Sequence, residues 1–254
     1  MSMRPRLLFY CQHSLGMGHL VRSFAIAGGL ANHFDVVFLN GGPLPEGQKP
    51  PEKIEIVNLP PLGFDSEMQL LSRDGSHTVA QAQQIRMEIM RKALDSVRPD
   101  VLLIELFPFG RKKFAGELIA LLEDARSLST PPVVVCSLRD ILVERNQHHD
   151  ELACHRATRY FDAVLVHSDA RFARLEESFH PCSKLKVPVH YTGFVTREKK
   201  EDAQPQARRE PRIVVSAGGG LVGEVLLRTA IQAYEFLRSA AKPEMRIIGG
   251  PFIP

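Results

Sequence analysis

Short apolar runs alternate with helix-like segments along most of the chain. The runs rich in β-branched residues predict strands, a weaker one at Val189–Thr192 and clearer ones at Arg6–Gln12, Asp35–Asn40, Ile54–Leu59, Val101–Leu106, Val133–Ser137 and Ala163–His167. The spacing between them predicts helices over residues 18–31, 77–97, 112–127, 145–160 and 169–179. Continuous apolar strands that alternate with helices are typical of a parallel sheet buried on both faces. The pattern therefore predicts an α/β fold.

The composition changes after residue 196. Residues 197–211 are charged, carry two prolines and contain no large apolar residue, which predicts an exposed linker after an N-terminal domain of residues 1–196. Residues 212–254 then restart the pattern with a strand, a helix and a strand at Arg212–Ala217, Val222–Ser239 and Met245–Ile248. A single β-α-β unit cannot enclose its own core. We therefore expect the first unit of a second, truncated domain, and a chain that is an inactive fragment of a longer protein.

Composition and charge exclude several classes of protein. The net charge of +3 is too small for a dedicated nucleic-acid binder. No apolar run approaches the length of a membrane span, and the first run is too short for a signal peptide. The four cysteines are scattered and form no CxxC pair, which favours a reducing compartment. We expect a cytoplasmic protein, with peripheral contact to the inner face of the membrane as an open alternative.

A glycine turn follows the first predicted strand. Gly16, Met17 and Gly18 lead into the first predicted helix, and two glycines let the backbone approach a ligand closely. The amides at the start of a helix favour a negative group such as a phosphate. A dinucleotide fingerprint would need a small residue in place of Val21 and an acid in place of Asn40, and a P-loop would need Gly-Lys-Ser/Thr. The turn therefore predicts an anion-facing ligand site, without support for NAD or ATP.

His19 stands at the mouth of this first helix. A neutral imidazole there can take a proton from an attacking hydroxyl, or the side chain only caps the turn. Arg22, one helical turn later, either meets an anionic group or pairs with a surface carboxylate. A second strand-glycine-helix turn contains Ser216, Gly218, Gly219 and Gly220. Two such turns on either side of a linker are more specific than one.

These motifs resemble those of the GT-B glycosyltransferases. The form Gly16-x-Gly18-His19-x-x-Arg22-Ser23 is similar to the turn in enzymes related to the one that adds N-acetylglucosamine to the lipid-linked peptidoglycan precursor, the family 28-like group. Three later stretches, Glu105–Arg111, Ser137–Ile141 and Val166–Asp169, also look like that group. The same glycine-histidine-arginine motif resembles UDP-sugar hydrolases of nonulosonic acid synthesis.

The resemblance implies a GT-B-like architecture. A Rossmann-like N-terminal domain would bind the acceptor, and the start of a second Rossmann-like domain would bind a nucleotide-sugar donor, expected to be UDP-linked. His19 would be the general base, Gly16–Gly18 and Arg22 would contact substrate, and Ser216 with Gly218–Gly220 would lie near the donor diphosphate. No metal and no cofactor are implied, and the acceptor would be a hydroxyl compound, free or lipid-linked. Water in place of the acceptor gives the hydrolase, and a non-catalytic ligand-binding domain is the third alternative.

Other candidates lie at the ends of predicted strands. Glu105 either orients the acceptor or His19, or caps the residues that follow it. Arg139 and Asp140 either bind a charged acceptor or pair with each other. The aromatic and basic run Phe107–Phe114 either touches an anionic membrane or is half-buried. His148 and His149 lack the HExxH spacing, so a solvated helix face is favoured over a metal site.

Overall fold

The protein divides into two compact units, which are taken in turn. The computed structural model describes residues 4–13, 17–45, 47–65, 67–143, 146–196, 212–218, 220, 223–240, 243–250 and 253. The expected linker 197–211 and two of the predicted site residues, Gly16 and Gly219, lie outside the described residues. The first unit lies within residues 1–196, and residues 197–254 belong to the second.

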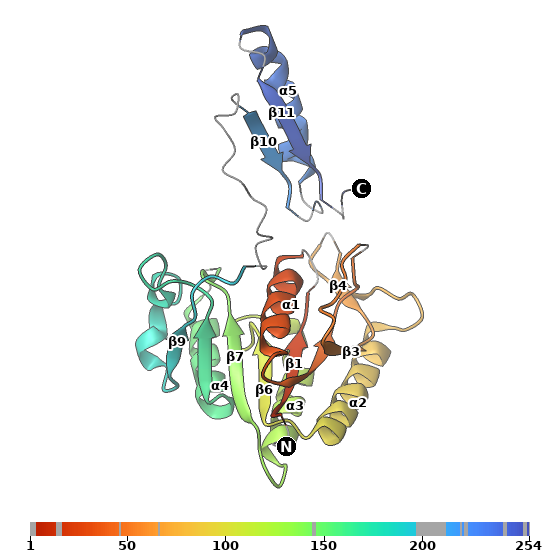
Figure 1. The fold of residues 1–254 in the computed structure, drawn as a ribbon, viewed down its shortest axis with the longest axis vertical. Helices are drawn as coiled ribbons and strands as arrows, with labels where there is room; N and C mark the ends of the chain where they lie inside the picture. The colour runs from red at the N-terminus through yellow and green to blue at the C-terminus, as the bar shows by residue number, and fades with distance from the viewer. Residues whose placement is uncertain are drawn as a thin grey trace. The chain divides into compact units, whose positions relative to one another are not determined.

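The first unit is built on a seven-stranded parallel sheet (Figure 1). Its order is β3-β2-β1-β6-β7-β8-β9. The strands are β1 Arg6–Cys11, β2 Asp35–Asn40, β3 Ile54–Asn58, β6 Val101–Glu105, β7 Val133–Leu138, β8 Ala163–Val166 and β9 Val189–Tyr191. The predicted α/β class is confirmed, and every strand expected in this part of the chain is present.

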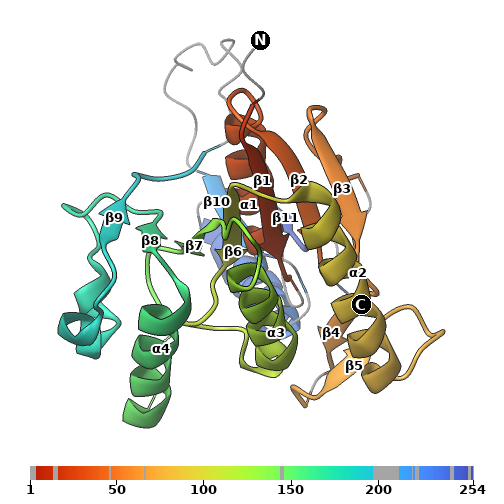
Figure 2. The ribbon, with the colours of Figure 1, turned by 90° about the horizontal axis from the view of Figure 1, so that it is seen from below.

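Helices cover both faces of the sheet (Figure 2). One face packs against α1, Gly18–Leu30, through a cluster in which Phe24 contacts Phe38 and Phe38 contacts Phe9. The other face packs against α2 Val79–Val97, α3 Ala115–Arg126 and α4 Gln147–Tyr160. Alternate residues of β1 reach the two cores, because successive strand side chains point to opposite faces.

The strand order reverses between β1 and β6. From β1 the chain moves outward through β2 and β3, and from β6 it moves the other way through β7, β8 and β9. In open parallel sheets, ligands bind outside the carboxyl ends of the strands at such a switch point. The residues that follow β1 and end β6 are therefore the first place to look for a site.

The structure differs from the local predictions at two places, one element that was not predicted and one predicted helix that is wrong. A short antiparallel hairpin, β4 Leu62–Phe64 and β5 Leu70–Ser72, was not expected. The helix expected over residues 169–179 is absent from this described segment, which holds turns and a short 3₁₀ helix, η2 Leu175–Glu177. Here the Asp169 carboxylate accepts the backbone N–H of Arg171. This local bond offers the backbone an alternative to helix.

The second unit is a single β-α-β element. Strands β10 Arg212–Ser216 and β11 Glu244–Ile248 pair in parallel, and α5 Glu224–Ala240 connects them. Large apolar side chains on this unit are exposed, among them Val214, Val225 and Leu226. In the described part of the chain, every helix is too short or too polar to cross a bilayer.

Candidate functional site

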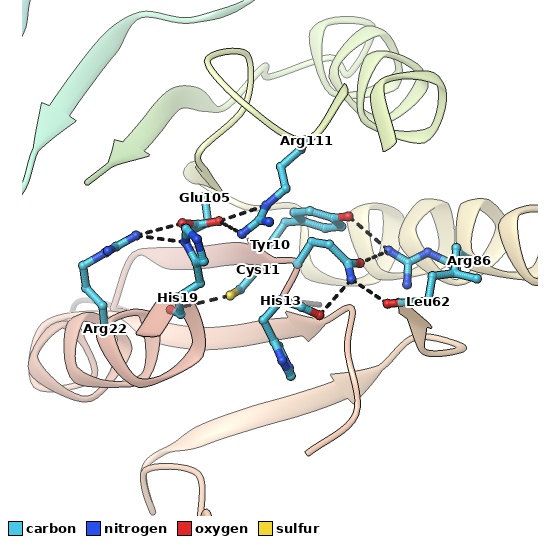
Figure 3. A network of polar contacts seen from close by, with 10 residues as sticks. Tyr10, Cys11, His13, His19, Arg22, Leu62, Arg86, Glu105 and Arg111 are labelled. Carbon is cyan, nitrogen blue, oxygen red and sulfur yellow. Dashed lines mark hydrogen bonds and ion pairs between the residues drawn. The ribbon is translucent and has the colours of Figure 1, made fainter. Parts of the chain in front are cut away.

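The carboxylate of Glu105 is the centre of a polar cluster at the switch point (Figure 3). Glu105 is the last residue of β6, and its side chain is fully buried. Its Oε1 lies 2.5 Å from Nδ1 of His19 and accepts a hydrogen bond from Nη2 of Arg22 at 2.8 Å. Its Oε2 accepts two hydrogen bonds from Arg111, at 2.6 Å from Nη2 and 3.2 Å from Nε. The start of α1 and the segment from Glu105 to Arg111, which are distant in sequence, therefore meet at one carboxylate.

The charge state of Glu105 fixes the role of the His19 ring. Burial raises the pKa of Glu105, but the charge of Arg111 and the contacts with His19 and Arg22 outweigh it and lower the pKa to about 2. An ionised carboxylate only accepts hydrogen bonds, so Nδ1 of His19 carries the proton. In a neutral imidazole the other nitrogen, Nε2, then holds the lone pair that can accept a proton.

Helix geometry brings His19 and Arg22 together. They occupy positions i and i+3 at the start of α1, and such positions share one face of a helix. The side chains of His19 and Arg22 are 25% and 19% exposed, whereas Glu105 is 0% exposed. The two basic groups are therefore accessible to a ligand, and the acid lies behind them.

Arg111 reaches Glu105 through a loop with unusual backbone angles. Leu106 and Arg111 have φ of 65° and 61°, in the left-handed region that residues with a side chain rarely adopt. These angles fold the chain back after β6, so that Arg111 forms the paired contact with the carboxylate. Such strain is often found at functional sites. Sequence reasoning did not assign Arg111 to the site; the one signal was its place at the end of the stretch Glu105–Arg111.

A second buried network supports the turn after β1. The guanidinium of Arg86, from α2, is fully buried and donates to Glu117 at 2.6 and 2.8 Å. It also donates to Tyr10 Oη at 3.0 Å and to Gln12 Oε1 at 2.8 Å (Figure 3). The Gln12 amide in turn donates to the backbone oxygen of Leu62 at 3.1 Å. This network holds the last residues of β1, and nothing in the sequence pattern of α2 indicated it.

Two buried histidines lie at the same edge of the sheet. His13 follows β1 and lies 3.1 Å from Asn40 Oδ1. His167 follows β8, with Nε2 2.8 Å from Ser137 Oγ and Nδ1 2.8 Å from Thr192 Oγ1. Burial lowers the pKa of each ring to about 4. Both are neutral near pH 7.

In the described part of the first unit, the hydrogen bonds of Glu105 go to none of the other predicted site residues besides His19 and Arg22. Arg139 and Asp140 pair with each other, Nε to Oδ1 at 3.4 Å, and both are partly exposed. Gly18 is the first residue of α1, and Met17 immediately precedes it. In the second unit, Gly218 has φ of 60°, and its N–H donates to Ser216 Oγ at 3.3 Å.

The last described glycine of the second turn also needs its lack of a side chain. Gly220 has φ of 93°, and a Cβ there would lie 2.4 Å from the oxygen of Gly249. A substitution at Gly220 would therefore be both strained and blocked by backbone.

The structure distinguishes between alternatives that the sequence left open at two places. The carboxylate that pairs with Arg22 is the buried Glu105 and not a surface acid. The aromatic side chains of the loop after β6 cannot touch a membrane, because Phe107, Phe109 and Phe114 are buried in the core.

The predicted histidine pair lies on an exposed helix start. His149 lies 2.9 Å from Lys112 Nζ and 2.6 Å from Asn146 Oδ1. In the ranges that the structure describes, His, Cys, Asp and Glu form no group of three suited to a metal ion.

No family model matches the sequence, and no curated protein matches it. Solved structures do. A UDP-glucosyltransferase from Polygonum tinctorium that glucosylates indoxyl aligns with a TM-score of 0.58 at 14% identity, over 99% of this chain and 73% of that one. UGT2 from Phytolacca americana aligns with a TM-score of 0.56 at 15% identity, over 99% of this chain and 73% of that one. CalG4, the calicheamicin glycosyltransferase, aligns with a TM-score of 0.55 at 16% identity, over 99% of this chain and 67% of that one. The chain therefore has the α/β fold of the GT-B glycosyltransferases.

Proposed function

We propose that this chain is part of a glycosyltransferase that moves a sugar from a nucleotide-sugar donor, UDP-linked, to a hydroxyl acceptor. The observation that carries the proposal is the His19–Glu105 pair at the switch point of the sheet, with 2.5 Å between Nδ1 and Oε1. The shared fold with the glucosyltransferases from Polygonum tinctorium and Phytolacca americana supports it.

In the proposed reaction, the acceptor hydroxyl oxygen attacks the anomeric carbon of the donor. A carbon–oxygen bond forms there, and the bond from that carbon to the diphosphate oxygen breaks, so the nucleoside diphosphate leaves with the electron pair. Nε2 of His19 takes the hydroxyl proton as general base. Glu105 accepts from Nδ1–H, holds the ring in the required tautomer and stabilises the imidazolium that forms. This step assigns no resident cofactor or metal.

Other residues are proposed to position the substrates. Arg111 and Arg22 fix the orientation of the Glu105 carboxylate by hydrogen bonds to both of its oxygens. Arg139 and Asp140 would shape the acceptor side, and the amides of Gly16–Gly18 would line the site after β1. Ser216 and the turn Gly218–Gly220 would contact the donor diphosphate.

Substitution of His19 tests the proposal in the intact natural protein. His19→Ala should reduce turnover of UDP-sugar by about a hundredfold or more, because general-base catalysis contributes roughly 10²–10⁴-fold. Donor affinity, measured calorimetrically, should change little. The matched control is His33→Ala, an exposed histidine just after the same helix, which should keep full turnover. Undiminished turnover of His19→Ala would remove the base from the mechanism.

Acceptor-free assays distinguish transfer from hydrolysis. A glycosyltransferase should release free sugar from UDP-sugar slowly without acceptor. Rapid stoichiometric release that His19→Ala abolishes would instead assign the same base to a hydrolase. Donor binding without turnover in either assay would identify a ligand-binding domain.

A further inference from the structure

The cluster around Glu105 carries more positive than negative charge. One carboxylate faces two guanidinium groups, Arg22 and Arg111. Arginine stays protonated in proteins, and the pKa of Glu105 is lowered to about 2, so all three are charged near pH 7. These three groups alone give the cluster a net charge of +1, whatever the charge of His19.

The surplus charge is on the accessible side. Glu105 is fully buried, and the side chain of Arg111 is 10% exposed, so both lie inside. Arg22 and His19 are the exposed members. The Nε atom of Arg22 is buried and is without a hydrogen-bond partner among the described residues. An unpaired donor on a charged group is costly, so the surroundings of Arg22 compensate its guanidinium only in part.

Neighbouring groups respond to this positive charge. After burial, the charge of Arg22 is the next cause that lowers the pKa of His167, and the opposing effect of Glu105 is smaller. Among the described residues the other buried acid is Glu117, and it is already paired with Arg86. The first turn of α1 adds the positive end of a helix dipole at His19. In the described part of the first unit, Arg22 and Arg111 thus share the single carboxylate of Glu105, and neither forms an ion pair with a second acid.

We propose that Arg22, beside His19, forms a subsite for a phosphate- or carboxylate-type oxyanion. This inference deepens the proposed function: it requires that one substrate bring a negative group to the catalytic histidine. The group is either the leaving diphosphate of the donor or an acidic group on the acceptor beside its reacting hydroxyl. The binding step itself needs no turnover and is measured separately.

The test follows the His19 Cε1–H resonance by NMR while inorganic phosphate is added to the full chain. Titrations are run at one fixed pH and at constant ionic strength, with chloride as the balancing salt, so that only phosphate binding moves the resonance. Phosphate should cause a saturable shift. Arg22→Gln should weaken binding by about tenfold, the effect of one charged hydrogen bond, and Arg22→Lys by less. Arg171→Gln, an exposed arginine paired with Asp169, is the matched control and should bind like the wild type.

Glu105→Gln should change the affinity for phosphate in the opposite direction. Loss of its charge raises the net charge of the cluster to +2, so phosphate should bind more tightly in this variant even though turnover falls. A role of Arg22 in structure alone predicts no such gain. If Glu105→Gln does not fold, the Arg22→Gln and Arg22→Lys pair still decides the question. No saturable shift in the wild type, or equal phosphate affinity in wild type and Arg22→Gln, would overturn the proposal.

A competition assay assigns the source of the anion. If UDP displaces phosphate from His19, the subsite takes the leaving diphosphate. If UDP leaves both the His19 shift and the phosphate affinity unchanged, the subsite takes an acidic group of the acceptor. Phosphate binding without His19-dependent turnover would disprove the proposed function and keep the subsite. Turnover that needs His19, without phosphate binding, would support the proposed function and disprove the subsite.

Discussion

Glu105 is a carboxylate with no exposed surface, and a buried charge is costly unless hydrogen bonds and opposite charge compensate for it. His19, Arg22 and Arg111 supply that compensation from two elements, α1 and the loop after β6. Arg111 contributes the only paired contact among the three. The two hydrogen bonds from Arg111 fix the plane of the Glu105 carboxylate. The carboxylate in turn orients the imidazole of His19.

Arg111→Gln should lower kcat by about tenfold to a hundredfold with little change in KM, because a slightly misplaced base loses reactivity more than binding. The measurement is steady-state kinetics of the intact protein on UDP-sugar. Arg171→Gln serves as control, since its arginine pairs with Asp169 in an exposed position. A change in KM alone would show that Arg111 contacts substrate and does not position Glu105.

At this scale the sequence could nominate residues whose place depends on strand ends and helix starts. His19 and Arg22 follow from the glycine turn, and Glu105 from the end of an apolar strand. Arg111 could not be nominated, because its approach to Glu105 depends on positive φ at Leu106 and at Arg111 itself. Backbone angles of that kind leave no signature in residue type when glycine is absent from those positions.

At the scale of elements, α2 and α3 are joined by a buried ion pair between Arg86 and Glu117. Arg86→Ala should destabilise the first unit by about 3–5 kcal/mol, because it removes the ion-pair partner of the buried Glu117 carboxylate. Arg91→Ala is the matched control on the same helix: its pair with Asp124 is exposed and should contribute less than about 1 kcal/mol. Urea unfolding followed by circular dichroism measures both. Similar losses of stability in the two variants would show that the buried pair contributes no more than the exposed pair.

Apolar periodicity was sufficient for the long elements and insufficient for the short ones. The parallel strands bury both faces, so their apolar runs mark them directly. The hairpin β4–β5 has only three residues in each strand and is held by backbone contacts to Asp65, among them the N–H of Gln69 at 2.8 Å. The segment after β8 has helix-forming residues, but the carboxylate of Asp169 accepts a hydrogen bond from the backbone N–H of Arg171 there. Local side-chain bonds of this kind compete with propensity.

At the scale of the whole molecule, the carboxyl edge of the sheet gathers polar side chains that cannot all be solvated. His13 and His167 are buried there as neutral rings, with pKa values lowered to about 4 by burial. The unfolded chain binds protons at these histidines near pH 6.5, and the folded chain does so only near pH 4. The contribution of these two neutral rings to stability is therefore complete above pH 6.5 and is lost as the pH falls toward 4.

The pH dependence of unfolding checks this account. The free energy of unfolding should fall by up to about 3 kcal/mol per histidine across that window. The free energy of unfolding of His167→Gln should fall less steeply with decreasing pH than that of the wild type. His33→Gln, at an exposed position, should keep the wild-type slope. Parallel curves for all three proteins would refute the contribution of His167.

The position of the site in the molecule follows from topology. The sheet reverses its order between β1 and β6, and the elements that carry His19 and Glu105 follow or end those two strands. The solved glycosyltransferases CalG4 and UGT2 share this α/β fold at 16% and 15% identity. The fold is therefore kept where sequence similarity has largely disappeared, and function has to be argued from the site.

A double-mutant cycle on kcat tests the central claim most directly, that His19 and Glu105 act as one unit. The intact protein is assayed as wild type, His19→Ala, Glu105→Gln and the double variant. We predict that Glu105→Gln lowers kcat by about a hundredfold in the wild type and by less than about twofold in the His19→Ala background, because a positioning residue has no effect without its base. An equal loss in both backgrounds would show that the two residues act independently and would contradict the proposed mechanism.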